Sequence, residues 1–254
     1  MMGDLKTLFP QHRVRTSDAE HARLEWLVQL FRDCPIPEAE ILMNLGLFMN
    51  GPALARILFM VELYQKIVGV QGSVIEFGPR WGQNMALWTE LRGFYEPYNH
   101  GRKIIGFDTF KGLSSVGAVD GEHTQDGEYT TTEDYEKYLA SVLRCHEAMS
   151  PVSHIQKFEI VKGDACEEFP AYLEAHPELI VALAYFDFDI YHPTKVCLGL
   201  LIDRMPAGAV IGFDQLNRAD FPGETVAVRE VLGIRGLRLQ RTSHSRETCF
   251  VVTS

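Results

Sequence analysis

The segment SVIEFGPRWGQN (residues 73–84) decides the fold class. In it a short apolar run, 74–77, leads through a glycine-containing turn into a helical pattern from about Asn84 to Tyr95. Glycine lets the backbone approach a ligand closely at such a turn, because it has no Cβ. The dinucleotide pattern G-x-G-x-x-G is absent, which argues against a nicotinamide cofactor. The segment predicts a strand, a turn and a helix, with or without a ligand at the turn.

Downstream, short apolar runs alternate with helical patterns, which is typical of a mostly parallel sheet covered by helices on both faces. Further strands are predicted at 103–107, 158–161, 180–186 and 209–213, with a closing antiparallel hairpin at 237–241 and 248–253. Helices are predicted between them at about 133–149, 165–175, 194–205 and 225–232. The sequence therefore predicts a doubly wound α/β domain with a seven-stranded sheet over residues 73–254.

The N-terminal third, residues 1–72, is expected to be a helical cap. Helical patterns run over 17–30, 38–47 and 52–68, with Ser17 and Asp18 as possible N-caps of the first. These helices carry more apolar surface than a lone cap needs, so we expect a homo-oligomer. Within the sheet domain, the polar stretch 114–132 is too long for a routine connection and is predicted to be a mobile lid.

Composition and charge exclude several classes of protein. The 254 residues carry a formal net charge of −10, which disfavours a general affinity for nucleic acid. No uninterrupted apolar run reaches the roughly 20 residues that cross a bilayer, and the N-terminus does not read as a signal peptide. The five cysteines include no C-x-x-C pair for a metal or a redox disulfide. We expect a cytoplasmic protein that acts on a small molecule.

Ligands of open parallel sheets bind beyond the carboxyl ends of the strands. After the second strand, Asp108 could accept both hydroxyl groups of a ribose, with Phe110 beside it as a stacking surface, or it could cap the turn that follows. After the third strand, Asp164 could contact an adenine or serve as the N-cap of the next helix.

Acidic residues follow the fourth and fifth predicted strands. The run YFDFDIY (residues 185–191) places Asp187 and Asp189 at the end of a buried strand, and Asp214 and Gln215 follow the next strand. Buried carboxylates require a cation, hydrogen-bond donors or water. Carboxylate and amide oxygens suit Mg²⁺ or another hard divalent ion. The alternative is a set of solvated acids in turns.

Taken together, these motifs resemble the macrocin O-methyltransferase family. The resemblance covers about residues 73–232 and rests on E-x-G-x-x-x-G from Glu76, D-T-F-x-G-L from Asp108, Lys162-Gly163, D-x-D-x-Y-x-x-T from Asp187 and G-x-x-x-x-x-D ending at Asp214. The family comprises S-adenosylmethionine-dependent and divalent-metal-dependent enzymes that methylate sugar hydroxyls of natural-product glycosides such as antibiotics. Two departures are Gln83, where the family has a second loop glycine, and Gln215, where it has a second acid.

The resemblance implies a role for each matching position. The loop from Glu76 through Gly78 to Gly82 would hold the amino-acid end of the methyl donor. Asp108, with the adjoining Thr109 and Phe110, would lie at the ribose, and Gly163 with Asp164 at the adenine. Three residues would hold the metal, namely Asp187, Asp214 and Gln215.

Methyl transfer to a sugar hydroxyl requires a base or a metal, because that hydroxyl does not ionise at neutral pH. Asp187 and Asp189 are candidate bases, and His192 is a third unless it is a solvated loop histidine. The lid contains four residues that either contact the acceptor or are solvated, namely Asp120, Glu122, His123 and Tyr129. Two other functions remain open: a non-catalytic protein that binds the donor, and a nucleotide-sugar enzyme with a nicotinamide cofactor.

Overall fold

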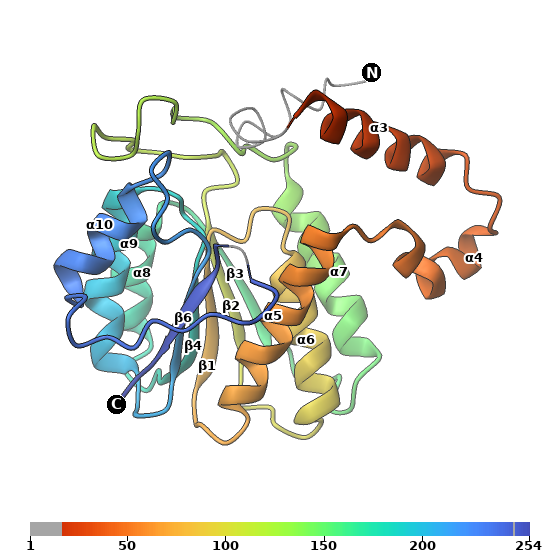
Figure 1. The fold of residues 1–254 in the computed structure, drawn as a ribbon. Helices are drawn as coiled ribbons and strands as arrows, with labels where there is room; N and C mark the ends of the chain where they lie inside the picture. Colours follow the sequence, from red (N-terminus) through yellow and green to blue (C-terminus); the bar gives the residue numbers. More distant parts are fainter. Residues whose placement is uncertain (1–16, 246) are drawn as a thin grey trace. The chain divides into compact units, whose positions relative to one another are not determined.

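The computed structural model describes residues 17–245 and 247–254 (Figure 1). The chain forms two compact units, which divide between Ala55 and Arg56. The boundary lies inside helix α5 (Gly51–Ile67), because the second half of this helix is buried. The domain boundary expected at residue 72 stays a prediction, but the compact units divide about a turn into α5 and not at its end.

The described part of the first unit is helical, as expected. It contains α3 (Asp18–Arg32), α4 (Glu38–Ile41), η1 (Leu42–Phe48) and the start of α5. Ser17 is confirmed as the N-cap of α3, where its hydroxyl accepts from the backbone N–H of Glu20 at 3.3 Å and the Glu20 side chain accepts from the Ser17 N–H at 2.8 Å. Several large apolar side chains of this unit are exposed, among them Trp26, Leu42, Met43 and Leu47. The homo-oligomer stays a prediction.

No single helix in the described ranges is long and apolar enough to cross a bilayer. The pair formed by 38–48 and 51–67 meets the length and composition test only when taken together, and it is bent by 94°.

The second unit is built on one six-stranded sheet, in the order β3-β2-β1-β4-β5-β6. The strands are β1 (Ser73–Phe77), β2 (Ile104–Asp108), β3 (Phe158–Lys162), β4 (Val181–Phe186), β5 (Val210–Phe213) and β6 (Cys249–Val252). The first five are parallel, and β6 pairs antiparallel with β5. The strand order reverses between β1 and β4, which is where sheets of this class bind ligands.

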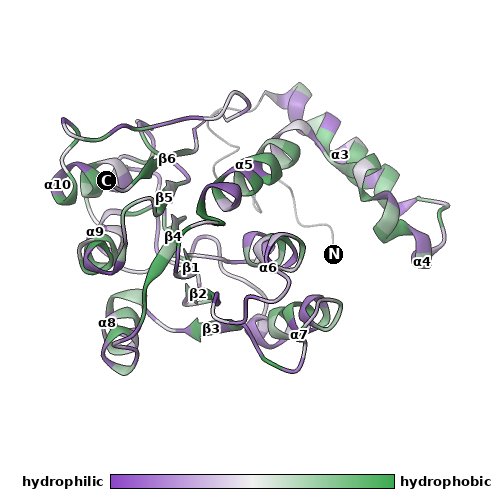
Figure 2. Cartoon of the chain, turned by 90° about the horizontal axis from the view of Figure 1, so that it is seen from below, coloured by the Kyte–Doolittle hydropathy of each residue, from purple (hydrophilic) through white to green (hydrophobic). Residues whose placement is uncertain are grey.

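Helices cover both faces of the sheet, which confirms the predicted doubly wound α/β class (Figure 2). On one face lie α5, α6 (Gln83–Tyr95) and α7 (Tyr135–Ala148), and on the other α8 (Ala165–Ala175), α9 (Tyr191–Leu201) and α10 (Gly223–Val231), with the short η2 (Ile202–Arg204) after α9. Successive strand residues serve opposite faces, so Tyr185 packs in the α5 side core and Phe186 in the α8 side core. Apolar side chains therefore flank the end of β4 on both faces of the sheet.

The described sheet has six strands, one fewer than predicted. The segment 237–241 forms no strand, and only Gln240 makes an isolated antiparallel bridge with Phe250. Its two backbone hydrogen bonds measure 2.8 and 2.9 Å. Arg238, Leu239 and Arg241 are exposed, so this segment has little buried apolar surface to hold it in a longer ladder.

Candidate active site

The turn after β1 is packed directly against the end of β4. Gly78 has φ +86°, and a Cβ on it would lie 2.3 Å from the carbonyl oxygen of Asp187. The Gly78 N–H donates to the Phe107 carbonyl and the Asp187 N–H to the Phe77 carbonyl, both at 2.9 Å. Glycine at this position therefore lets the tips of three strands meet.

Two further residues of the β1 loop are buried. Glu76 accepts from Asn84 Nδ2 at 2.6 Å through Oε1, whereas its Oε2 has no hydrogen-bond partner among the described residues. Burial raises the pKa of Glu76 to about 8. Gly82 has φ +73°, and a Cβ on it would lie 2.3 Å from Leu139 Cδ1. The loop is closely packed, and Glu76 keeps one carboxylate oxygen for a ligand.

Asp108 lies at the tip of β2, as predicted. Its two oxygens accept from the backbone N–H groups of Arg80, at 2.7 Å, and Phe110, at 2.6 Å. Burial raises the pKa of this carboxyl group. Thr109 donates to the Gly112 carbonyl at 2.9 Å, and the Phe110 ring is buried in the α5 side core. Thr109 and Phe110 therefore build the turn that presents Asp108.

At the tip of β3, Gly163 contacts the neighbouring strand and Asp164 caps the next helix. The Gly163 N–H donates to the Asp108 carbonyl at 3.0 Å, which joins the tips of β3 and β2. The Asp164 carboxylate accepts from the Cys166 N–H at 2.9 Å and caps α8. The N-cap interpretation of Asp164 is confirmed, and a contact of these residues with adenine stays a prediction.

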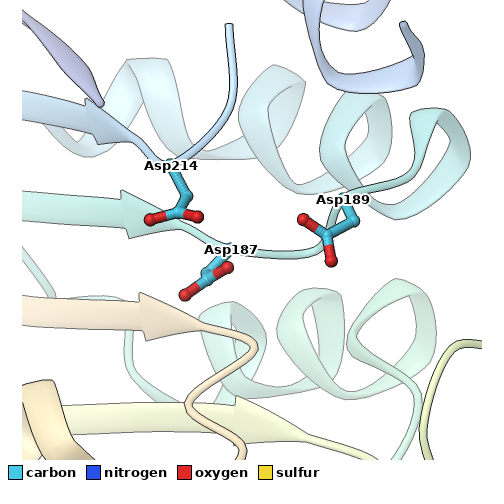
Figure 3. Close-up of side chains that lie close together, drawn as sticks. All are labelled: Asp187, Asp189 and Asp214. Carbon is cyan, nitrogen blue, oxygen red and sulfur yellow. The ribbon is translucent and has the colours of Figure 1, made fainter. Parts of the chain in front are cut away.

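Three carboxylates converge beyond β4 and β5. Oxygen atoms of Asp187, Asp189 and Asp214 lie within 4.8 Å of one another, which we call the acidic cluster (Figure 3). Figure 3 shows Asp187 and Asp189 on the segment that follows β4, and Asp214 on the segment that follows β5. The predicted ligand Gln215 lies beside them, because its Nε2 donates to Asp189 Oδ1.

Arg56 of α5 is a residue of this site that the sequence interpretation missed. Its guanidinium group donates to Asp187 Oδ2 at 3.1 and 3.2 Å and to Asp214 Oδ1 at 2.6 Å. The Tyr185 hydroxyl donates to the same Asp214 oxygen at 2.6 Å. A signal existed in the sequence, because Arg56 is the lone charge in the apolar run from Ala53 to Val61.

Glu224 of α10 is a second residue that the sequence interpretation missed. It is fully buried, and no hydrogen bond of ordinary geometry from a described residue reaches either carboxylate oxygen. Burial and the charges of Asp214 and Asp189 hold its pKa well above the usual range. The same causes, burial first and then the charge of Asp214, raise the pKa of Asp187 to about 7.

The residues present fit a divalent cation. Asp187 and Asp214 share the guanidinium of Arg56, whereas neither Asp189 nor Glu224 has an ion pair in the described part of the chain, so the cluster is under-neutralised. Among the described residues, Gln215 Oε1 and both oxygens of Glu224 are buried without partners. Oxygen donors of this kind are the ligands that Mg²⁺ and related ions prefer.

The remaining candidate residues, from α9 and the predicted lid, are not members of the acidic cluster. His192 is exposed in the first turn of α9, and it is not grouped with Asp187 and Asp189 among the described residues. Glu122 and His123 are exposed in the predicted lid. Asp120 is buried and accepts from the Tyr191 N–H at 2.6 Å. It therefore caps α9 and joins the lid segment to this helix. Movement of the lid stays a prediction.

Two solved structures of one protein are similar to this chain over nearly its whole length. The crystal structure of CalS11, described as a calicheamicin methyltransferase, is 35% identical over 99% of this chain and 97% of its own, with a TM-score of 0.91. A second, apo structure of CalS11, described as a TDP-rhamnose 3′-O-methyltransferase, is 34% identical over 94% and 96%, with a TM-score of 0.83. The O-methyltransferase NovP, at 14% identity, 79% and 80% coverage and a TM-score of 0.60, shares the fold. No family model and no curated protein matches the chain.

Proposed function

Because this chain belongs to the same sugar O-methyltransferase family as CalS11, we propose that it transfers a methyl group from S-adenosylmethionine to a sugar hydroxyl in natural-product biosynthesis. The chain is an S-adenosylmethionine-dependent O-methyltransferase. The observation that carries the proposal is the 35% identity over 99% of the chain, combined with the convergence of Asp187, Asp189 and Asp214 at the switch point of the sheet.

The donor occupies the tips of β1, β2 and β3. The Glu76 to Gly82 loop holds the methionine end, and the Asp108 carboxylate accepts from the ribose hydroxyls. Support comes from the free Oε2 of Glu76 and from the backbone bonds that fix Asp108 in place. Gly163 lies on the same edge and adjoins the adenine.

Asp189 acts as the base that accepts the proton of the sugar hydroxyl. It is buried, it belongs to the acidic cluster, and Gln215 rather than Arg56 is its hydrogen-bond partner. Asp187, Asp214 and Gln215 hold a divalent cation such as Mg²⁺, which supplies electrostatic stabilisation of the developing alkoxide when it is bound. Arg56 keeps Asp187 and Asp214 in their positions through its two ion pairs.

The reaction is an in-line displacement. The hydroxyl oxygen forms a bond to the methyl carbon as the carbon–sulfur bond breaks, the electron pair of that bond stays on sulfur, and the proton goes to Asp189. Most of the rate enhancement comes from the alignment of two bound molecules. The products are S-adenosylhomocysteine and a methyl ether.

Two classes of methyl acceptor both carry a sugar hydroxyl, a natural-product glycoside and a nucleotide-activated sugar. The sequence resemblance implies a natural-product glycoside, whereas the name of CalS11 specifies a nucleotide-activated sugar. We propose the nucleotide-activated deoxysugar, since CalS11 is similar over nearly the whole chain.

The test incubates the protein with S-adenosylmethionine, Mg²⁺ and either TDP-rhamnose or a rhamnosylated glycoside, and follows the methylated sugar by mass spectrometry. Methylation of TDP-rhamnose supports the proposal, and methylation of the glycoside alone would replace the acceptor. Thermal shifts with S-adenosylhomocysteine and with NAD separate the remaining functions. Stabilisation by S-adenosylhomocysteine without turnover on any sugar would indicate a non-catalytic donor-binding protein. Loss of turnover in EDTA would support a role for the divalent cation in the reaction.

A further inference from the structure

Arg80, in the donor loop, and Tyr129 form a cation–π pair. Tyr129 belongs to the 114–132 segment, and the Arg80 guanidinium carbon lies 4.9 Å from the centre of its ring. Each residue also has a buried polar atom without a hydrogen-bond partner among the described residues, namely Nε of Arg80 and the hydroxyl of Tyr129. Buried polar atoms are paired in most folded proteins, so a ligand or a water molecule is needed to complete these two.

Arg80 belongs to the donor loop itself, and Tyr129 brings the lid segment to it. Arg80 comes two residues after Gly78, and its backbone N–H donates to Asp108 at 2.7 Å. The charges of Asp187 and Asp189 act on both Arg80 and Tyr129. Backbone hydrogen bonds hold the neighbouring lid residues, because the Glu128 carbonyl accepts from the Leu113 N–H at 2.8 Å.

The charged side chains near Arg80 interact differently with the two charged groups at the methionine end of the donor. The methionine end of the donor carries an ammonium and a carboxylate. Glu76 and Asp187, in their ionised forms, favour the ammonium and repel the carboxylate, which therefore needs a cation of its own. Arg56 is already paired with Asp187 and Asp214. No ion pair in the described part of the chain engages the Arg80 guanidinium.

We infer that the Arg80 guanidinium and the Tyr129 hydroxyl bind the carboxylate of the methyl donor. The inference rests on the proposed function and deepens it. A guanidinium that stacks by its face on an aromatic ring keeps its in-plane N–H groups free, and those groups match a carboxylate. The Tyr129 hydroxyl adds a donor from the lid segment, so that donor binding and the position of this segment are linked.

The competing explanation is that Arg80 only packs between Tyr129 and Trp81, whose ring centre lies 5.5 Å away. A packing role would affect every ligand of the donor site equally. A carboxylate-binding role affects only ligands that have the carboxylate.

The experiment measures the dissociation constants of two ligands by calorimetry, S-adenosylhomocysteine and its decarboxylated analogue S-adenosyl-3-thiopropylamine, which retains the ammonium. Arg80→Met should weaken S-adenosylhomocysteine about 10- to 100-fold and the analogue less than about twofold, since a hydrogen-bonded charge pair is lost only for the former. Tyr129→Phe should produce the same selective loss at about 3- to 10-fold. Arg144→Met removes an exposed arginine of α7 as the matched control and should change neither constant.

Equal weakening of both ligands by Arg80→Met would assign Arg80 to packing and overturn the inference. Unchanged binding of S-adenosylhomocysteine by both variants would also overturn it. Should Arg80→Met fail to fold, Tyr129→Phe and Arg80→Lys carry the same comparison, because a lysine side chain at this position would retain the charge without the planar fork. A wild-type protein that binds neither ligand would overturn the proposed function, and this inference with it.

Discussion

The two halves of the site, on the same edge of one sheet, are built in different ways. At the tips of β1, β2 and β3 the backbone supplies most of the contacts, and Asp108 is held by two backbone N–H groups. At the tips of β4 and β5, side chains face one another, and their only cation within hydrogen-bond distance in the described chain is Arg56 of α5. The backbone of the first half is held in place by its own hydrogen bonds, whereas the second half is short of positive charge. The first half, which we propose binds the donor and call the donor half, is therefore preformed, and the acidic half requires a proton, a cation or a substrate.

The largest expected effect is on catalysis in the acidic half. Asp189→Asn removes the proposed base, keeps the shape of the side chain and tolerates the φ of +63° at this position. We expect kcat to fall about 10²- to 10⁴-fold, with the affinity for S-adenosylhomocysteine unchanged. The measurement is turnover on TDP-rhamnose together with calorimetry.

Asp203→Asn, an exposed acid of η2, is the control for this change and should leave kcat unaltered. A kcat within threefold of wild type for Asp189→Asn would remove Asp189 as the base.

The next effect belongs to the donor half. Asp108→Ala removes a carboxylate proposed to bind the ribose, and we expect the dissociation constant of S-adenosylhomocysteine to rise about 10- to 100-fold. It also removes two hydrogen-bond acceptors, so the melting temperature should fall. Asp164→Ala is the comparison, since Asp164 caps α8 and its loss should reduce stability with a smaller change in affinity. Wild-type affinity in Asp108→Ala would place the ribose elsewhere.

A third change acts on the contact that joins the halves. In Gly78→Ala the new Cβ would lie 2.3 Å from the Asp187 carbonyl oxygen. The backbone at this position also has a φ of +86°, which an alanine rarely adopts. Gly127→Ala has a similar φ of +82° with nothing within 4 Å, so it reports the backbone strain alone. We expect urea unfolding to show a loss of about 1 kcal/mol for Gly127→Ala and about 2–3 kcal/mol for Gly78→Ala. Equal losses of unfolding free energy in the two variants would mean that the close contact between Gly78 and Asp187 does not contribute to stability.

The effect that is smallest per unit of the variable changed is a pH dependence from Glu76. Its folded-state pKa of about 8 lies above the value of an unfolded glutamate, so the stability that it contributes is complete below pH 4.5 and is lost as pH rises to about 8. Glu76→Gln should flatten the fall in unfolding free energy over this range, by less than about 1.4 kcal/mol per pH unit. The measurement is urea unfolding at several pH values in EDTA. A pH profile that is unchanged by the substitution would contradict the raised pKa.

The comparison also explains which parts of the site were predictable. Asp108 and Gly78 lie directly after strands, and their partners are on the adjoining strand tips, so strand patterns alone placed them. Asp187 and Asp214 were predicted to converge for the same reason. Arg56 was missed because its hydrogen bond to Asp214 joins positions 158 residues apart. The seventh strand was predicted from the run 237–241, in which the structure leaves Leu239 exposed and pairs only Gln240 with a strand.

The sequence by itself determined the doubly wound sheet, the helical N-terminal region and the acids at the strand tips, because these follow from local periodicity and from the fixed direction of parallel strands. Only the tertiary structure decided the charge balance of the site. Arg56, Glu224 and the Arg80 and Tyr129 pair come from helices and loops whose approach to the sheet depends on packing of the whole unit. Electrostatic interaction and desolvation depend on distance in space, and sequence separation does not record that distance.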